Sequence, residues 1–199
     1  MRIGLLGGTF DPIHNAHVRL AQTAYQKLAL NEVQLIPAGR PWQKPALQAS
    51  AEHRAAMIRL AIADLEGLKL NTEELERAGT TYTIDTLESL PPEHTYFWIL
   101  GTDQLTNFCS WHRWADIAKR VTLLVAARPT IPFAIPEPLD ALVKQGQASV
   151  QILPFEPEDL SASQLRLSVS SGRAITGLVC NDVETYIEQH GLYSKPPIE

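Results

Sequence analysis

Six short apolar runs alternate with longer segments of helical spacing, and this alternation constrains the fold of the 199-residue chain most strongly. The runs cover residues 2–6, 32–37, 68–71, 95–100, 121–126 and 149–153. Between the first two, Val18, Ala21, Tyr25 and Leu28 step by three or four positions and share one helical face. Apolar strands that alternate with amphipathic helices indicate a parallel sheet covered on both faces. We therefore predict a doubly wound α/β fold, built as a single domain over residues 1–199.

Composition and charge exclude several classes of function. Lysine and arginine number 17 against 22 aspartates and glutamates, a net charge of −5, so bulk electrostatic binding of nucleic acid is not expected. No apolar run approaches the roughly 20 residues of a membrane span, and residues 3–6 begin a strand rather than a secretory signal. We predict a cytoplasmic protein. Cys109 and Cys180 form no CxxC pattern and are interpreted as free thiols.

The segment directly after the first predicted strand has the outline of an anion site. Gly7 and Gly8 are followed by residues 9–17 and then by the first amphipathic helix. Adjacent glycines let backbone N–H groups approach a ligand, and a helix amino terminus adds partial positive charge. The dinucleotide fingerprint is absent because Leu6 and Thr9 stand where it needs glycine, and no Gly-Lys-Ser/Thr follows. The chain thus lacks both common phosphate motifs.

His14 and His17 are three positions apart at the expected start of this helix, so their rings can converge. Zinc binding is one interpretation, but the segment lacks the His-Glu-x-x-His spacing of zincins and offers no third ligand. Capping or surface histidines are the alternative interpretation. The position of the pair after a glycine turn favours a ligand-binding role over both.

Residues 8–17, Gly-Thr-Phe-Asp-Pro-Ile-His-Asn-Ala-His, resemble the GxFDPxHxGH signature of adenylyltransferases that share a Rossmann-like fold with class I aminoacyl-tRNA synthetases. Ala16 replaces the glycine of that signature. The resemblance implies that residues 7–17 bind ATP, through Gly7, Gly8, Thr9, Phe10, His14 and His17.

A second segment, residues 160–166, is similar to the ISSTxIR helix start of the same family. Serines before a helix cap it and present hydroxyl groups, and a guanidinium is suited to phosphate oxygens. Ser161, Ser163 and Arg166 are the corresponding ATP-binding candidates. Two positive helix ends that face one crevice would suit a triphosphate.

Further segments resemble the bacterial nicotinate-nucleotide adenylyltransferases, so that the resemblance covers residues 2–193. These segments are 82–87, 99–105, 111–114, 186–187 and 191–193, with a divergent piece at 40–44. The resemblance implies an acceptor site at 82–87 and 101–114. There Trp111 would stack on the pyridine ring, backbone groups of Thr83 and His112 would meet its carboxylate, and Asp103 would contact ribose hydroxyls or magnesium.

The resemblance implies a reaction in which ATP and nicotinate mononucleotide give deamido-NAD and pyrophosphate, with His14, His17, Lys44 and Arg166 as catalytic residues. Mg²⁺ would be carried by the ATP phosphates rather than by protein ligands. Nicotinamide mononucleotide or phosphopantetheine remain as other acceptors, and a non-catalytic adenine-nucleotide sensor remains as a different class; a dehydrogenase is disfavoured by the missing glycine spacing. No nucleic-acid or membrane partner is expected, and a homo-oligomer is allowed.

Overall fold

The computed structural model describes residues 1–40, 47–127, 133–156 and 160–194. Its strands are β1 (Arg2–Gly8), β2 (Glu32–Pro37), β3 (Leu68–Leu70), β4 (Thr95–Gly101), β5 (Thr122–Ala127) and β6 (Ser149–Pro154). Its helices are α1 (Asn15–Lys27), α2 (Ala51–Ile62), α3 (Glu73–Glu76), α4 (Thr83–Ser89), α5 (Thr102–Thr106), the 3₁₀ helix η1 (Phe108–Ser110), α6 (Trp114–Arg120), α7 (Glu137–Lys144), α8 (Ala162–Ser170) and α9 (Asn181–Gln189).

The strands of the described residues form one parallel sheet in the order β3-β2-β1-β4-β5-β6. The doubly wound α/β fold predicted from the sequence is confirmed, and the strand ends differ from the predicted ones by at most two residues. β1 pairs with β2 on one side and β4 on the other, so strand order reverses beside β1. Ligands of such sheets bind beyond the carboxyl ends of the strands at this reversal.

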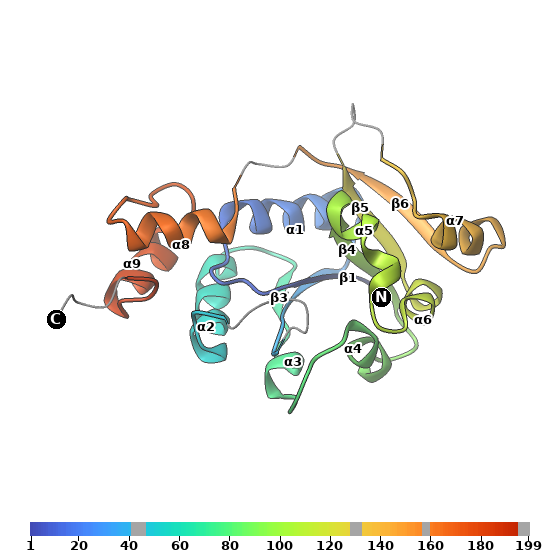
Figure 1. The fold of residues 1–199 in the computed structure, drawn as a ribbon, viewed down its shortest axis with the longest axis horizontal. Coiled ribbons are helices and arrows are strands. Elements are labelled where there is room, and N and C mark those ends of the chain that lie inside the picture. The colour runs from blue at the N-terminus through green and yellow to red at the C-terminus, as the bar shows by residue number, and fades with distance from the viewer. Residues whose placement is uncertain (41–46, 128–132, 157–159, 195–199) are drawn as a thin grey trace.

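Two apolar clusters cover the two faces of the sheet. One joins α1, α2, α8 and α9 to the sheet, and the other joins α4, α5, α6 and α7. Figure 1 shows α8 and α9, in orange and red, at the end of the molecule opposite α7. Each apolar cluster contacts one of the predicted binding segments. Phe10, in the loop after β1, belongs to the first cluster, and Trp111 packs against the second.

β6 departs from the expectation of strands covered on both faces. It is the edge strand, four of its six residues are exposed, and Ile152 keeps 59% of its surface accessible. A strand at the sheet edge has only one neighbour, and here the helices leave most of its residues uncovered. In the proline-rich stretch 129–138, Pro136 is the residue before α7 and Pro138 lies in its first turn, a position that tolerates a missing N–H; Pro129 and Pro132 lie outside the described residues.

Candidate active site

The two glycines at the end of β1 face opposite sides of the sheet. A Cβ atom on Gly7 would lie 2.8 Å from the ring of Trp98, and one on Gly8 would lie 3.1 Å from the ring of Phe10. Both distances are too short for comfortable packing. A side chain on Gly7 would therefore collide with Trp98, and one on Gly8 would fit only if the Phe10 ring shifted by a few tenths of an ångström.

The loop after β1 is buried and held by hydrogen bonds from distant parts of the chain. Phe10 is 1% exposed and has a φ of 48°, a conformation uncommon for a residue other than glycine. The carboxylate of Asp11 accepts hydrogen bonds from the backbone N–H groups of Gln48 (2.9 Å) and Ala49 (3.0 Å) and from the hydroxyl of Tyr193 (2.7 Å). Because the Phe10 side chain is in the core, its predicted contact with ATP would have to use the backbone.

Arg54 is a buried cation beneath this loop. Its side chain is 1% exposed, and Nη1 donates to the carbonyl oxygens of Thr9 (2.9 Å) and Ala38 (2.7 Å). Burial lowers the pKa of the guanidinium, and the neighbouring Asp11 carboxylate opposes that shift. Thr9 follows β1 and Ala38 follows β2, so one side chain joins two strand ends at the predicted ligand edge of the sheet.

His14 and His17 converge, as their spacing predicts. His14 immediately precedes α1, and the two rings stack with centroids 3.7 Å apart and an interplanar angle of 25°. Phe10 completes this cluster, because its ring and that of His17 meet edge to face, with centroids 5.0 Å apart. Burial lowers the pKa of His14 to about 4, and its Nδ1 is buried with no hydrogen-bond partner among the described residues. At neutral pH and without a bound anion, the His14 imidazole is therefore uncharged.

The second predicted phosphate segment begins α8 with a capping box. The Ser161 hydroxyl accepts from the Gln164 N–H (3.2 Å), and the Ser161 N–H donates to Gln164 Oε1 (2.8 Å). The Ser161 hydroxyl is thus already engaged, while Ser163 is exposed. Arg166 donates from Nη2 to the Ser163 hydroxyl (3.2 Å) and from Nη1 to the backbone carbonyl of Asp11 (2.7 Å). The two predicted phosphate segments, 155 positions apart, therefore meet directly.

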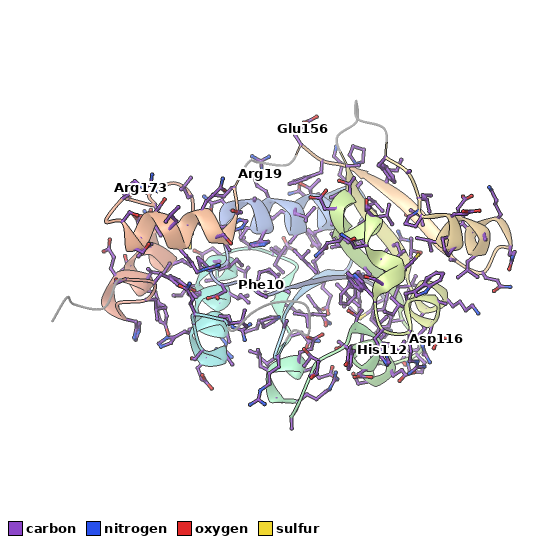
Figure 2. All side chains as sticks on the ribbon, viewed as in Figure 1. Phe10, Arg19, His112, Asp116, Glu156 and Arg173 are labelled. Carbon is purple, nitrogen blue, oxygen red and sulfur yellow. The ribbon has the colours of Figure 1, made fainter. Side chains whose placement is uncertain are left out.

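A pocket opens beside the glycine turn, on the face of the sheet that carries Trp98 and Trp111 and not on the face that carries Phe10. It contains about 760 Å³, including the space at its open mouth. Its lining includes Gly7, Gly8 and Thr9 together with Thr83, Trp111 and His112. Three of the four predicted acceptor residues thus share one pocket with the phosphate loop. Figure 2 shows the two regions, with Phe10 near the middle of the molecule and His112 beside α4 and α6.

The aromatic wall of the pocket is built from several rings. Trp111 is half-buried, meets Trp98 edge to face at 6.3 Å and lies 5.4 Å from Phe108. The ring of the exposed His112 lies 4.5 Å from that of Tyr82. An aromatic platform of this kind suits a flat heterocycle.

Arg113 connects the two predicted acceptor segments. Its guanidinium bonds to both carboxylate oxygens of Glu88 in α4 (2.9 and 3.3 Å) and to Asp116 in α6 (2.8 Å). Exposed ion pairs contribute little to stability singly. Their role here is geometric, because they bring the loop at 111–113 against the helix that begins at Thr83, whose first N–H groups have no partner within the helix.

Two predicted residues are not placed in this site. Asp103 is exposed in the first turn of α5 and does not line the pocket, although its neighbour Gln104 does. Its contact with ribose hydroxyls or magnesium therefore stays a prediction, since the residue next to it, Gln104, is the one that lines the pocket. Lys44 lies outside the described residues.

Residues that the sequence analysis did not assign to the site include Asp11 as a hydrogen-bond acceptor, Arg54, Tyr193 and Glu74. Glu74 is 7% exposed, lines the pocket and accepts a hydrogen bond from the Thr86 hydroxyl (2.8 Å), and burial raises its pKa. Arg54 had a detectable signal, since an arginine shares a helical face with Met57, Ile58 and Ile62. Tyr193 had none beyond its place in a segment that resembles the family.

Three expectations about the rest of the molecule can be compared with the described residues. Cys109 and Cys180 are free cysteines, as predicted. No group of three His, Cys, Asp or Glu side chains that could hold a metal ion is found in the part of the chain that the structure describes. In the same part, no helix has the length and apolar character needed to cross a membrane.

Comparison with known proteins gives consistent results. The family model described as cytidylyltransferase-like matches residues 5–168. A Bordetella pertussis protein named "Probable nicotinate-nucleotide adenylyltransferase" is 51% identical over 192 residues, which cover 96% of this chain and 98% of that protein. A Methylibium petroleiphilum protein of the same name is 39% identical, over 98% of this chain and 93% of that protein. The structure of Plasmodium falciparum nicotinic acid mononucleotide adenylyltransferase complexed with NaAD matches the fold with a TM-score of 0.75 at 20% identity, covering 96% and 97% of the two chains.

Proposed function

The chain belongs to the cytidylyltransferase-like family and, within it, to the nicotinate-nucleotide adenylyltransferases, and we propose that the pocket and loop beyond β1 perform that activity. The substrates are ATP and nicotinate mononucleotide, and the products are deamido-NAD and pyrophosphate, a step of NAD biosynthesis. The observation that carries the assignment of the site is the continuity of the glycine turn with the aromatic pocket. ATP would lie over residues 7–17 and the mononucleotide would lie against Trp111.

The reaction needs positioning more than acid–base chemistry. A 5′-phosphate oxygen of the mononucleotide attacks the α-phosphorus of ATP, a new P–O bond forms, and the bond to the β-phosphate bridging oxygen breaks to release pyrophosphate. The attacking phosphate is already an anion at neutral pH, so no proton has to be removed. Preorganised donors that stabilise charge on the α-phosphoryl oxygens and on the leaving group supply the catalysis.

The described residues suggest how these roles divide. We assign His17 and the neutral His14 to hydrogen bonds with the phosphates at the start of α1, and Arg166 to the charge of the triphosphate. Lys44 remains a proposed cation on the basis of the family resemblance. The backbone N–H groups at Gly7 to Thr9 would complete the phosphate contacts.

Acceptor recognition would use the opposite face of the turn. Trp111 would stack on the pyridine ring, and the backbone N–H groups near Thr83 and His112 would meet its carboxylate. A carboxylate accepts hydrogen bonds from such N–H groups, whereas a carboxamide presents only one acceptor oxygen. This difference favours the acid over nicotinamide mononucleotide, which is retained as the second candidate acceptor.

ATP-dependent adenylyltransferases commonly use a divalent metal. We infer Mg²⁺, bound by the ATP phosphates and water, because Mg²⁺ typically combines few protein ligands with substrate phosphates. The single domain over residues 1–199, a homo-oligomer and a cytoplasmic location also stay predictions.

A direct assay tests the proposed function. Purified protein is mixed with ATP and either the acid or the amide mononucleotide, with and without Mg²⁺, and pyrophosphate and dinucleotide are measured. We expect Mg²⁺-dependent dinucleotide formation with preference for the acid. Equal rates with both acceptors would refute the proposed carboxylate contacts, and nucleotide binding without pyrophosphate release would indicate a sensor instead of an enzyme.

A further inference from the structure

The last described stretch of the chain, residues 191–194, reaches back to the loop that follows the first strand. Tyr193 is 9% exposed and belongs to the apolar cluster that contains Phe10. Its hydroxyl donates to Asp11 Oδ1 at 2.7 Å. A buried phenol hydroxyl needs a hydrogen-bond partner, and here that partner is a residue 182 positions away, in the loop after β1.

Asp11 connects this hydroxyl to the phosphate-binding elements. Its carboxylate is 2% exposed and also receives the N–H groups of Gln48 and Ala49. Its backbone carbonyl receives the Arg166 guanidinium at 2.7 Å. One residue thus holds the C-terminal tyrosine through its side chain and a proposed ATP contact through its main chain.

The placement of this contact relates it to catalysis. Asp11 lies two residues after Thr9, whose carbonyl accepts from Arg54, and three residues before His14, which immediately precedes α1. A shift of the Asp11 side chain would therefore displace the segment between Thr9 and His14, and with it the Asp11 carbonyl that accepts from Arg166. Burial and the contact with Asp11 raise the pKa of Tyr193, so the hydroxyl keeps the proton that it donates.

We propose that Tyr193 is a positioning residue that acts through Asp11 to hold residues 9–14 and Arg166 in the geometry for adenylyl transfer. The inference rests on the proposed function, because the loop matters to the reaction only if it binds the ATP phosphates. The tyrosine and the aspartate do not touch the reacting atoms. Small displacements of positioned groups reduce turnover more than they reduce substrate binding, since only the transition state requires the full alignment.

The test uses Tyr193→Phe, which keeps the ring in the core and removes only the hydroxyl. We expect kcat to fall about tenfold, while the KM for nicotinate mononucleotide changes less than about twofold. Tyr186→Phe is the matched control, because it also removes one hydroxyl contact, but that contact is with His53 Nδ1 in α2 (2.9 Å) and not with the loop after β1. The control should keep the wild-type kcat.

A double-mutant cycle separates positioning from general stability. Asp11→Asn should also lower kcat, and the combined variant Asp11→Asn/Tyr193→Phe should lose much less than the product of the two single losses, because both act through one contact. Thermal unfolding is followed for every variant. A kcat of Tyr193→Phe equal to wild type, or multiplicative losses in the double variant, would overturn the inference. If the wild-type protein still synthesises the dinucleotide, either result refutes only the role of Tyr193 and leaves the proposed function intact. If the wild-type protein makes no dinucleotide, the proposed function itself is refuted.

Discussion

The two sides of the glycine turn are built differently. On the α1 side, the loop of residues 9–14 is buried, and Arg54, Tyr193 and Arg166 hold it by hydrogen bonds to its carbonyl and carboxylate oxygens. On the other side, the acceptor pocket is open and aromatic, and its loop at 111–113 is anchored by exposed ion pairs. Preorganised groups contribute mainly to the transition state, whereas an open stacking surface contributes mainly to binding. Changes on the first side should therefore reduce kcat, and changes on the second should raise KM.

The largest expected effect is that of His17→Ala. Loss of a preorganised donor at a developing charge typically lowers turnover on the order of 10²- to 10³-fold. We expect a loss of this size in kcat with an ATP dissociation constant within about threefold of wild type. Steady-state kinetics and titration calorimetry measure the two quantities. Equal losses in kcat and in ATP affinity would contradict the distinction between the two sides.

The buried state of His14 predicts a pH dependence of stability on the same side. Its pKa is about 4 in the folded protein against 6.5 for a free imidazole, so the unfolded chain binds the proton more tightly. The contribution of the neutral His14 to the free energy of unfolding is complete above pH ~6.5. It is lost as the pH falls toward about 4, by up to ~3 kcal/mol. Urea unfolding between pH 7.5 and 4.5 measures it.

His14→Gln supplies the control for that measurement. The variant lacks the titrating group and should lose less stability between pH 6.5 and 4.5 than the wild type, while other acid-sensitive groups affect both proteins equally. Parallel pH profiles for the two proteins would show that His14 does not titrate as its burial indicates.

The sequence predicted the sheet, the glycine turn and the convergence of the two histidines, because all three depend on local spacing and strand order. It could not predict which hydrogen bonds fix the loop after β1. The contacts of Asp11 with Tyr193 and Arg166 span 182 and 155 positions, and no periodicity reports such distances. The neutral state of His14 was likewise inaccessible, since the pKa depends on burial by side chains from other elements.

On the acceptor side, Trp111→Ala should raise the KM for nicotinate mononucleotide about tenfold or more, since stacking on an aromatic side chain contributes ~1–3 kcal/mol per base. The KM for ATP should stay within about twofold. Trp114→Ala is a matched control, because Trp114 packs on Phe108 but does not line the pocket. A loss in kcat without a change in KM would indicate that Trp111 acts as core and not as a platform.

Asp103→Asn should have the smallest effect on the KM for nicotinate mononucleotide, and it tests whether α5 belongs to the acceptor site. Family resemblance points to Asp103 as a contact of ribose or magnesium, but the side chain is exposed in α5 and Gln104 lines the pocket instead. We expect the KM for the mononucleotide to change less than about twofold, while Gln104→Ala should change it more. If Asp103→Asn instead raises the KM tenfold or shifts the Mg²⁺ dependence, α5 must rotate toward the pocket when substrates bind. The acceptor side would then be formed partly by its ligands, in contrast to the loop after β1, which hydrogen bonds within the protein already hold in place.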